Sequence, residues 1–157
     1  MHKNEQLIEK FYTAFQKRDH QTMNSCYHDD IEFSDMVFIG LKGHQAKSMW
    51  HMLCERGKDL EITFSGISAN DQKGKAHWEA KYTFSVTGNK VHNIIDATFE
   101  FRDGKIIKHQ DTFDLWRWAG LALGLKGQLL GWLPPVQASI RQQGMKGLEA
   151  FIEKNPK

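Results

Sequence analysis

The sequence lacks most of the short motifs that reveal a protein's chemistry. Its two cysteines, Cys26 and Cys54, form neither a CxxC pair nor a metal-type cluster, so we expect reduced thiols rather than a disulfide. His44 and His51 lie seven residues apart with no HExxH motif, which favours surface histidines over a metal site. There is also no glycine-rich phosphate loop and no Gly-x-Ser-x-Gly. The sequence therefore predicts no metal, no cofactor and no serine nucleophile.

Net charge and long apolar runs are also scarce. Against 21 basic residues stand 19 acidic ones, and the net charge of +2 is too small to favour nucleic acid or an anionic membrane as a partner. The N-terminus has no apolar signal region, so we expect a cytoplasmic protein. The apolar stretch 115–133 contains Arg117 and Lys126, and its uncharged segments are shorter than the roughly 18 residues of a membrane span. No spanning helix is expected.

What the 157 residues do contain is a series of helices followed by strands, in a chain long enough for one domain. Apolar residues at helical spacing predict a helix over 4–18 with Asn4 as its cap, and Asp19 can cap a short second helix. Alternation of apolar and polar residues then predicts strands. This order indicates an α+β fold, with an antiparallel sheet covered on one face by helices. Gly66 is a candidate for a bulge that bends the sheet.

Turn signals set the expected register of this sheet. Gly88-Asn89 predicts a two-residue hairpin loop, which places Trp78 opposite Phe99. A three-residue turn over 102–104, with Gly104 left-handed, then places Ala97 opposite His109. Because strand residues alternate faces, one face of the strand near 105–116 carries Ile107, His109, Asp111, Phe113 and Leu115.

His109 and Asp111 are the strongest functional signal in the chain. Two titratable side chains on an otherwise apolar, buried face are costly unless they are paired or used. They stand two residues apart on one strand face, so their side chains can touch. The pair indicates a pocket with acid/base chemistry; the alternative is a satisfied buried pair with no further role.

The order of elements resembles the nuclear transport factor 2-like superfamily, which includes ketosteroid isomerases and SnoaL-like polyketide cyclases. The resemblance covers roughly residues 4–116, with matching stretches at 19–35, Gly40-Leu-Lys-Gly43 and 99–106. It implies a cone-shaped curved sheet wrapped around the N-terminal helices, a cystatin-like α+β barrel. It also implies a homodimer.

Site residues follow from the resemblance only position by position. Asp35 occupies the place of the isomerases' general base, whereas Phe11 stands where their first-helix tyrosine would be, with Tyr12 expected to face elsewhere. Asp96 matches their second donor, yet strand parity favours an outer-face ion pair with Lys81 for it. Asp111 resembles a catalytic aspartate of limonene epoxide hydrolases, but the Arg-x-Asp that those enzymes need is missing, so epoxide hydrolysis is not supported.

Three functions remain open at this point. The first is an acid/base isomerase or cyclase in which Asp35 is the general base and the pair His109 and Asp111 polarises the substrate oxygen. The second is a non-catalytic module that binds a small apolar ligand in the same internal pocket. The third is a protein that interacts through its surface. The residues expected to line the pocket are aromatic: Phe11, Phe15, Phe33, Trp50, Trp78, Tyr82, Phe84, Phe99 and Phe113.

The tail falls outside the resemblance. We divide the chain into a barrel domain over 1–116 and a C-terminal helical extension over 117–157 that packs on the same domain. Gly120, Gly124, Gly127 and Gly131 permit close approach of helices in this extension. Among a lid over the open end of the cone, a dimer contact and a surface-seeking amphipathic segment, the sequence favours the lid or the dimer contact.

Overall fold

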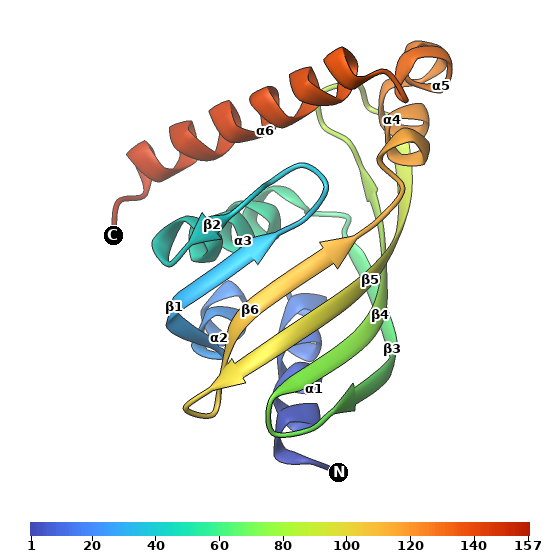
Figure 1. Cartoon of the computed structure of the whole chain (residues 1–157). Coiled ribbons are helices and arrows are strands. Elements are labelled where there is room, and N and C mark those ends of the chain that lie inside the picture. The colour runs from blue at the N-terminus through green and yellow to red at the C-terminus, as the bar shows by residue number, and fades with distance from the viewer.

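A computed structural model describes all 157 residues as six helices and a six-stranded sheet (Figure 1). In chain order the elements are α1 Lys3–Gln16, α2 His20–Ser25, β1 Tyr27–Ser34, β2 Leu41–Lys42, α3 His44–Arg56, β3 Glu61–Ala69, β4 Lys73–Thr83, β5 Lys90–Arg102, β6 Lys105–Thr112, α4 Leu115–Leu123, α5 Leu125–Leu130 and α6 Pro134–Lys154. The α+β class is confirmed, and α1 and α2 are the two helices expected from the sequence.

The sheet is curved and unclosed, with strand order β2-β1-β6-β5-β4-β3. Its concave side holds α1, α2 and α3, while α6 lies across the end at which β6 leads into α4 (Figure 1). One pairing differs from the antiparallel expectation, because β1 runs parallel to β6. The chain pairs β2 with one side of β1 first and reaches the other side of β1 only with β6, after β3, β4 and β5, so the sheet is mixed.

The β4–β5 hairpin corrects the predicted register. Its loop spans residues 84–89 and is closed by Phe84, whose N–H donates to the Asn89 carbonyl at 2.8 Å, so Gly88-Asn89 is not a two-residue turn. Trp78 consequently pairs with Ile95 rather than Phe99. The shift is four residues, an even number, and therefore leaves every side chain on its predicted face.

The β5–β6 turn differs as well, with a compensating irregularity. Arg102 pairs with Lys105, which makes a two-residue turn at Asp103–Gly104 where three residues were expected. That turn alone would have exchanged the two faces of β6. The register shifts, however, between Phe101, which pairs with Ile106, and Glu100, which pairs with Lys108. Ile107 is therefore the extra residue of a bulge. Ile106 takes the core position predicted for Ile107, and His109 and Asp111 stay on the buried face.

Two further local predictions can be compared directly. The register between β3 and β4 shifts after Ser65, and Gly66 has a φ of +63°, so the predicted bulge is confirmed. Helix α1 is capped by His2 instead of Asn4: the His2 ring accepts from the Asn4 N–H, and the Glu5 side chain accepts from the His2 N–H. This arrangement is a capping box.

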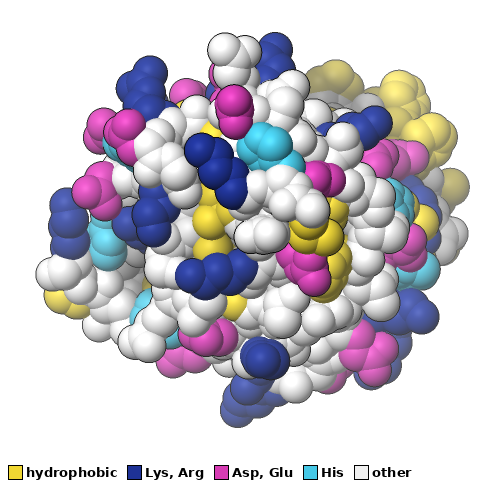
Figure 2. Space-filling model, turned by 90° about the horizontal axis from the view of Figure 1, so that it is seen from below, with side chains coloured by type: hydrophobic (Ala, Val, Ile, Leu, Met, Phe, Trp, Pro, Cys, Tyr) yellow, Lys and Arg dark blue, Asp and Glu magenta, His cyan; other side chains and the backbone are white.

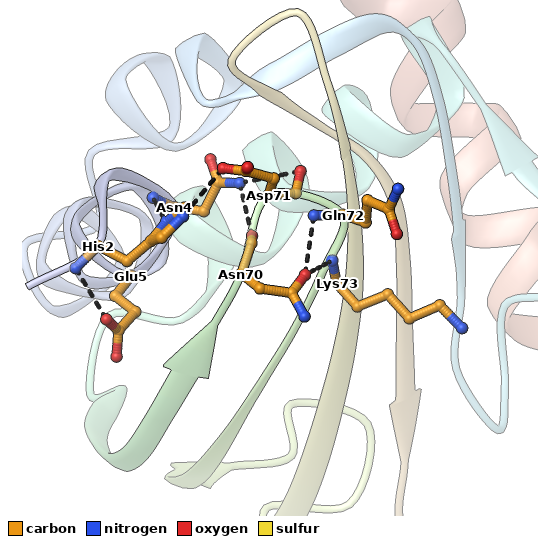
Figure 3. Close-up of polar contacts among 7 residues, drawn as sticks. All are labelled: His2, Asn4, Glu5, Asn70, Asp71, Gln72 and Lys73. Carbon is orange, nitrogen blue, oxygen red and sulfur yellow. Dashed lines mark hydrogen bonds and ion pairs between the residues drawn. The ribbon is translucent and has the colours of Figure 1, made fainter.

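Asn4 has a different role, which Figure 3 shows. Its side-chain amide donates to the Asn70 carbonyl at 2.9 Å, and the Asn70 side chain in turn accepts from the N–H groups of Gln72 and Lys73. Asp71 lies 3.0 Å from the His2 ring. These contacts tie the first turn of α1 to the β3–β4 turn. The end of the molecule that includes this tie is seen in Figure 2, where basic, acidic and histidine side chains are mixed around a short apolar strip.

Two apolar clusters stabilise the fold. The larger contains 27 buried residues from the sheet, α1, α3 and the C-terminal half of α6, including Leu148 and Phe151. The smaller joins Val91 of β5 to Leu115, Trp118, Ala119 and Ala122 of the α4 region, with Tyr82, Phe84 and Phe113 packed against it. No helix in the chain unites the length and apolarity needed to cross a bilayer.

Helices α4 and α5 approach each other closely through glycine. A Cβ atom added at Gly127 would overlap the backbone of Ala119, whereas one added at Gly120 would come no nearer than 3.1 Å, to the flexible side chain of Gln128. We expect Gly127→Ala to lower the free energy of unfolding by about 2 kcal/mol through forced separation of the two helices, as in other overpacked sites.

Urea denaturation followed by circular dichroism measures this cost. Gly120→Ala is the matched control and should change stability much less, because its closest neighbour is the side-chain Cγ of Gln128 rather than backbone. Equal stability of the Gly127→Ala variant and the parent chain would contradict the close packing of α4 on α5.

Candidate functional site

A chain of hydrogen bonds runs through the buried interior and ends on Asp111. Trp50 Nε1 of α3 lies 2.8 Å from the Tyr27 hydroxyl, which lies 2.7 Å from His109 Nδ1. His109 Nε2 lies 2.9 Å from Asp111 Oδ1, and Trp78 Nε1 lies 3.3 Å from the same oxygen. Four of these five side chains were singled out from the sequence; Tyr27, the first residue of β1, was not.

The direction of these bonds follows from donor counting. An indole N–H only donates, so Trp50 donates to Tyr27 and Trp78 donates to Asp111. If Tyr27 then donates its proton to His109 Nδ1, His109 is neutral and donates from Nε2 to Asp111, and every buried donor has an acceptor. A charged His109 would leave the Tyr27 proton with none. We therefore assign the neutral Nε2–H tautomer.

His109 is enclosed by aromatic rings. It is fully buried, its ring centroid lies 4.4 Å from that of Phe99 and 5.0 Å from that of Phe33, and both nitrogens are engaged. The side chain is thus placed to hold Asp111 rather than to touch a ligand. At Asp111, both bonds go to Oδ1, which leaves Oδ2 without a hydrogen-bonding partner in the protein.

The aromatic residues predicted to line the pocket fall into two groups. Six are buried in the large core cluster: Phe11, Phe15, Phe33, Trp50, Trp78 and Phe99. The other three, Tyr82, Phe84 and Phe113, are only partly buried and lie where the sheet meets α4. The second group, with Trp118, borders the end of the cone at which β6 leads into α4, which we call the wide end.

Asp35 follows the last residue of β1 and begins a tight turn. Its Oδ1 accepts from the N–H groups of Val37 and Phe38, each at 2.7 Å, while its own N–H donates to the Phe38 carbonyl. No protein group bonds Oδ2. Burial raises the pKa of Asp35 to about 7, the two backbone N–H groups oppose that rise, and the negative charge of Asp111 adds to it. An aspartate with this pKa exchanges protons near neutral pH.

Tyr82 belongs to the same electrostatic neighbourhood. Its hydroxyl accepts from Trp118 Nε1 at 2.8 Å, which leaves its own proton available to another acceptor. Burial raises the pKa of Tyr82, and the charge of Asp35 raises it further. The charge of Asp111 therefore acts on Asp35, and the charge of Asp35 acts on Tyr82.

Tyr12 is the residue that sequence reasoning misplaced. It was expected to face away, but it is fully buried, stacks on Phe64 with centroids 5.6 Å apart, and its hydroxyl has no hydrogen-bond partner. Burial raises the pKa of Tyr12 well above its usual value, and the charge of Asp111 contributes. The four-residue step from Ile8 to Tyr12 was the signal that would have placed it on the core side of α1.

Asp96 lies on the outer face of the sheet, as strand parity favoured. Its partner is His77, at 2.9 Å, instead of the expected Lys81, because of the four-residue shift in the hairpin. Its side chain is 80% exposed. Asp96 is therefore far from the group formed by Asp35, Asp111 and Tyr82.

Residues 8–109 match the model of the SnoaL-like domain, which is more than half of the chain. The chain belongs to the SnoaL-like family. No curated protein matches it.

Solved structures share the fold of this SnoaL-like protein at low sequence identity. An LEH-like epoxide hydrolase from M. tuberculosis is 20% identical over 82% of this chain and 96% of its own, with a TM-score of 0.64. IdmH, a proposed polyketide cyclase from Streptomyces antibioticus, is 18% identical over 79% and 100%, with a TM-score of 0.65. A proposed SnoaL-like polyketide cyclase from Jannaschia sp. CCS1 is 13% identical over 76% and 90%, with a TM-score of 0.66.

The hydrogen-bond chain can be tested with two tyrosines of equal burial. Tyr27→Phe leaves the Trp50 N–H and His109 Nδ1 without partners, so we expect the free energy of unfolding to fall by about 2–3 kcal/mol. Tyr12→Phe removes a hydroxyl that has no partner and should change stability by no more than about 0.5 kcal/mol. Urea denaturation measures both; similar losses in the two variants would argue against the assigned chain.

The raised pKa of Asp35 predicts a pH-dependent stability. The folded protein keeps the proton up to about pH 7, while the unfolded chain loses it near pH 4, so the free energy of unfolding falls as pH rises between these values. Asparagine retains an oxygen for the turn but cannot ionise. At pH 8 we expect Asp35→Asn to be more stable than the parent by about 2 kcal/mol, a value reduced for partial solvation.

Thermal denaturation from pH 4 to pH 8 provides the measurement. The exposed Asp30, on the same strand, gives the control Asp30→Asn, which as a surface substitution should stay within about 0.5 kcal/mol of the parent. A pH-independent difference for Asp35→Asn would mean that Asp35 titrates like a surface carboxylate.

Proposed function

We propose that this SnoaL-like protein binds a small apolar carbonyl compound at the wide end of the cone and transfers a proton on it, as an isomerase or cyclase. The observation that supports the proposal is the pKa of about 7 at Asp35, whose unbonded Oδ2 shares its surroundings with Asp111 and Tyr82. A base is most useful when its pKa lies near the working pH.

The proposed reaction begins with proton abstraction. The Asp35 carboxylate takes a proton from the carbon next to the carbonyl, and the electron pair of the broken C–H bond moves onto the carbonyl oxygen. Tyr82, whose hydroxyl proton is free, donates a hydrogen bond to the oxygen as it becomes negative. Protonated Asp35 then returns the proton to another carbon, which gives an isomer. Alternatively, the enolate carbon attacks a second carbonyl of the same molecule and closes a ring; the electron pair of that C=O bond moves to its oxygen, and the resulting alkoxide takes the proton from Asp35.

The remaining predicted catalytic residues have supporting roles in this proposal. Burial raises the pKa of Asp35, Asp111 adds to that rise through its negative charge, and His109 holds Asp111 in place. Phe84, Phe113 and Trp118 offer the apolar surface against which the substrate skeleton packs. The deeper aromatic residues form the floor that fixes the polar chain.

A second candidate is a non-catalytic carrier for the same class of ligand. It is favoured by the use of Asp35 Oδ1 in a turn and by the complete enclosure of His109, both of which are structural roles. In that case Tyr82 and Asp35 anchor one polar group of the ligand, and no bond is broken. The expected homodimer is compatible with both candidates and stays a prediction.

A thermal-shift screen with apolar ketones identifies ligands. A compound present at a hundred times its dissociation constant should raise the free energy of unfolding by roughly 2.7 kcal/mol. Each ligand is then incubated in D2O with the parent chain and with Asp35→Asn, and deuterium at the carbon beside the carbonyl is measured by NMR.

The enzyme proposal expects exchange catalysed by the parent chain, with a rate that rises toward a plateau above pH 7, and at least a hundredfold slower exchange with Asp35→Asn, in line with loss of a general base. Binding without catalysed exchange in either chain would establish the carrier. Absence of any ligand would count against both candidates.

A further inference from the structure

The corner formed by α4, α5 and the following turn exposes five large apolar side chains. Trp116 is 49% exposed, Leu125 69%, Leu129 62%, Leu130 40% and Trp132 54%. We call these five residues the α4–α5 corner. In Figure 1 it projects at the upper right, beyond the sheet and beside the start of α6. Isolated exposed leucines are ordinary in proteins, but such a group of leucines and tryptophans marks an interaction surface.

The corner is a single, ordered surface. The indole N–H of Trp116 donates to the Gln128 carbonyl at 3.0 Å, and that of Trp132 donates to the Leu129 carbonyl at 3.1 Å. A Cβ atom added at Gly131 would lie 3.2 Å from the Trp116 ring, so this tryptophan rests against the turn after α5. Both indole N–H groups are thus satisfied by α5, and the rings present apolar surface to the outside.

The segment of the chain that includes the corner carries charge of one sign. From Leu115 to Leu148 the chain has no acidic residue, but it has Arg117, Lys126, Arg141 and Lys146. Lys126 lies on α5 among the exposed leucines and forms no ion pair. The whole chain, by contrast, is nearly balanced. Asp114, just before α4, is occupied as the N-cap of that helix.

We propose that the α4–α5 corner docks on the surface of an anionic lipid bilayer, with its leucines and tryptophans in the interface and Lys126 at the lipid phosphates. Tryptophan favours the boundary between headgroups and acyl chains, and an amphipathic helical segment with basic residues lies in that boundary without crossing it. A second copy of the chain fits less well, because a symmetric contact through the corner would bring Lys126 and Arg117 against like charges with no acidic residue between them.

Flotation of the full chain with lipid vesicles tests this proposal. Vesicles of phosphatidylcholine alone are compared with vesicles that also contain phosphatidylglycerol. We expect binding to the anionic vesicles, weaker binding at high salt, and a partition coefficient at least about tenfold lower for the double variant Leu129→Ser/Trp132→Ser. Lys126→Glu should lower it about fivefold or more.

The matched control is Ile39→Ser. Ile39 lies in the β1–β2 connection, and its side chain is 62% exposed, as is that of Leu129. It should bind as the parent does, and circular dichroism verifies that all variants are folded. Failure of the parent chain to float with either vesicle would overturn the proposal, as would full binding by the double variant. A dimer in solution that the double variant converts to a monomer would assign the corner to a second copy instead.

Discussion

The buried Asp111 carboxylate is the group on which the polar contacts of the interior depend. A charge in an aromatic environment is costly unless donors converge on it, and here the Trp78 indole and the His109 ring both bond Oδ1. His109 is fixed in turn by Tyr27, and Tyr27 by Trp50. One ionised oxygen therefore orients side chains on β4, β6, β1 and α3. Burial raises the pKa of both Asp35 and Tyr12, and the charge of Asp111 adds to each rise.

The fold class and the burial of His109 and Asp111 were predicted correctly from the sequence, although the loop lengths used to derive the strand register were wrong. Both hairpins were read with the wrong loop length. The β4–β5 error was an even number of residues, and the β5–β6 error was cancelled by the bulge at Ile107. The alternation of apolar residues constrained the faces more strongly than the turn residues did, because a sheet with its apolar face in water would be far less stable. The alternation of apolar residues does not determine which residue pairs with which across two strands, so the partner of Asp96 was predicted wrongly.

What the sequence did not reveal depends on contacts between distant segments. Tyr27 lies 82 residues before its partner His109, and nothing local indicates that its hydroxyl meets an imidazole. The turn after Asp35, with two backbone N–H groups on Oδ1, is a conformation that the run Asp-Met-Val-Phe does not announce. The parallel pairing of β1 with β6 was missed for a similar reason, since hairpin signals report only on neighbours in the chain.

The anchoring of α6 has a consequence for how the chain is divided. The family match ends at residue 109, yet Leu148 and Phe151 complete the main core, and the Phe151 ring stands edge-on to His51 of α3 at 4.9 Å. The region that matches the family model is thus shorter than the region that forms the main core. Cutting the chain at the end of the shared region would strip apolar cover from α3, the helix that carries Trp50. Changes at the far C-terminus are therefore expected to reach the buried hydrogen-bond chain through the packing of that helix.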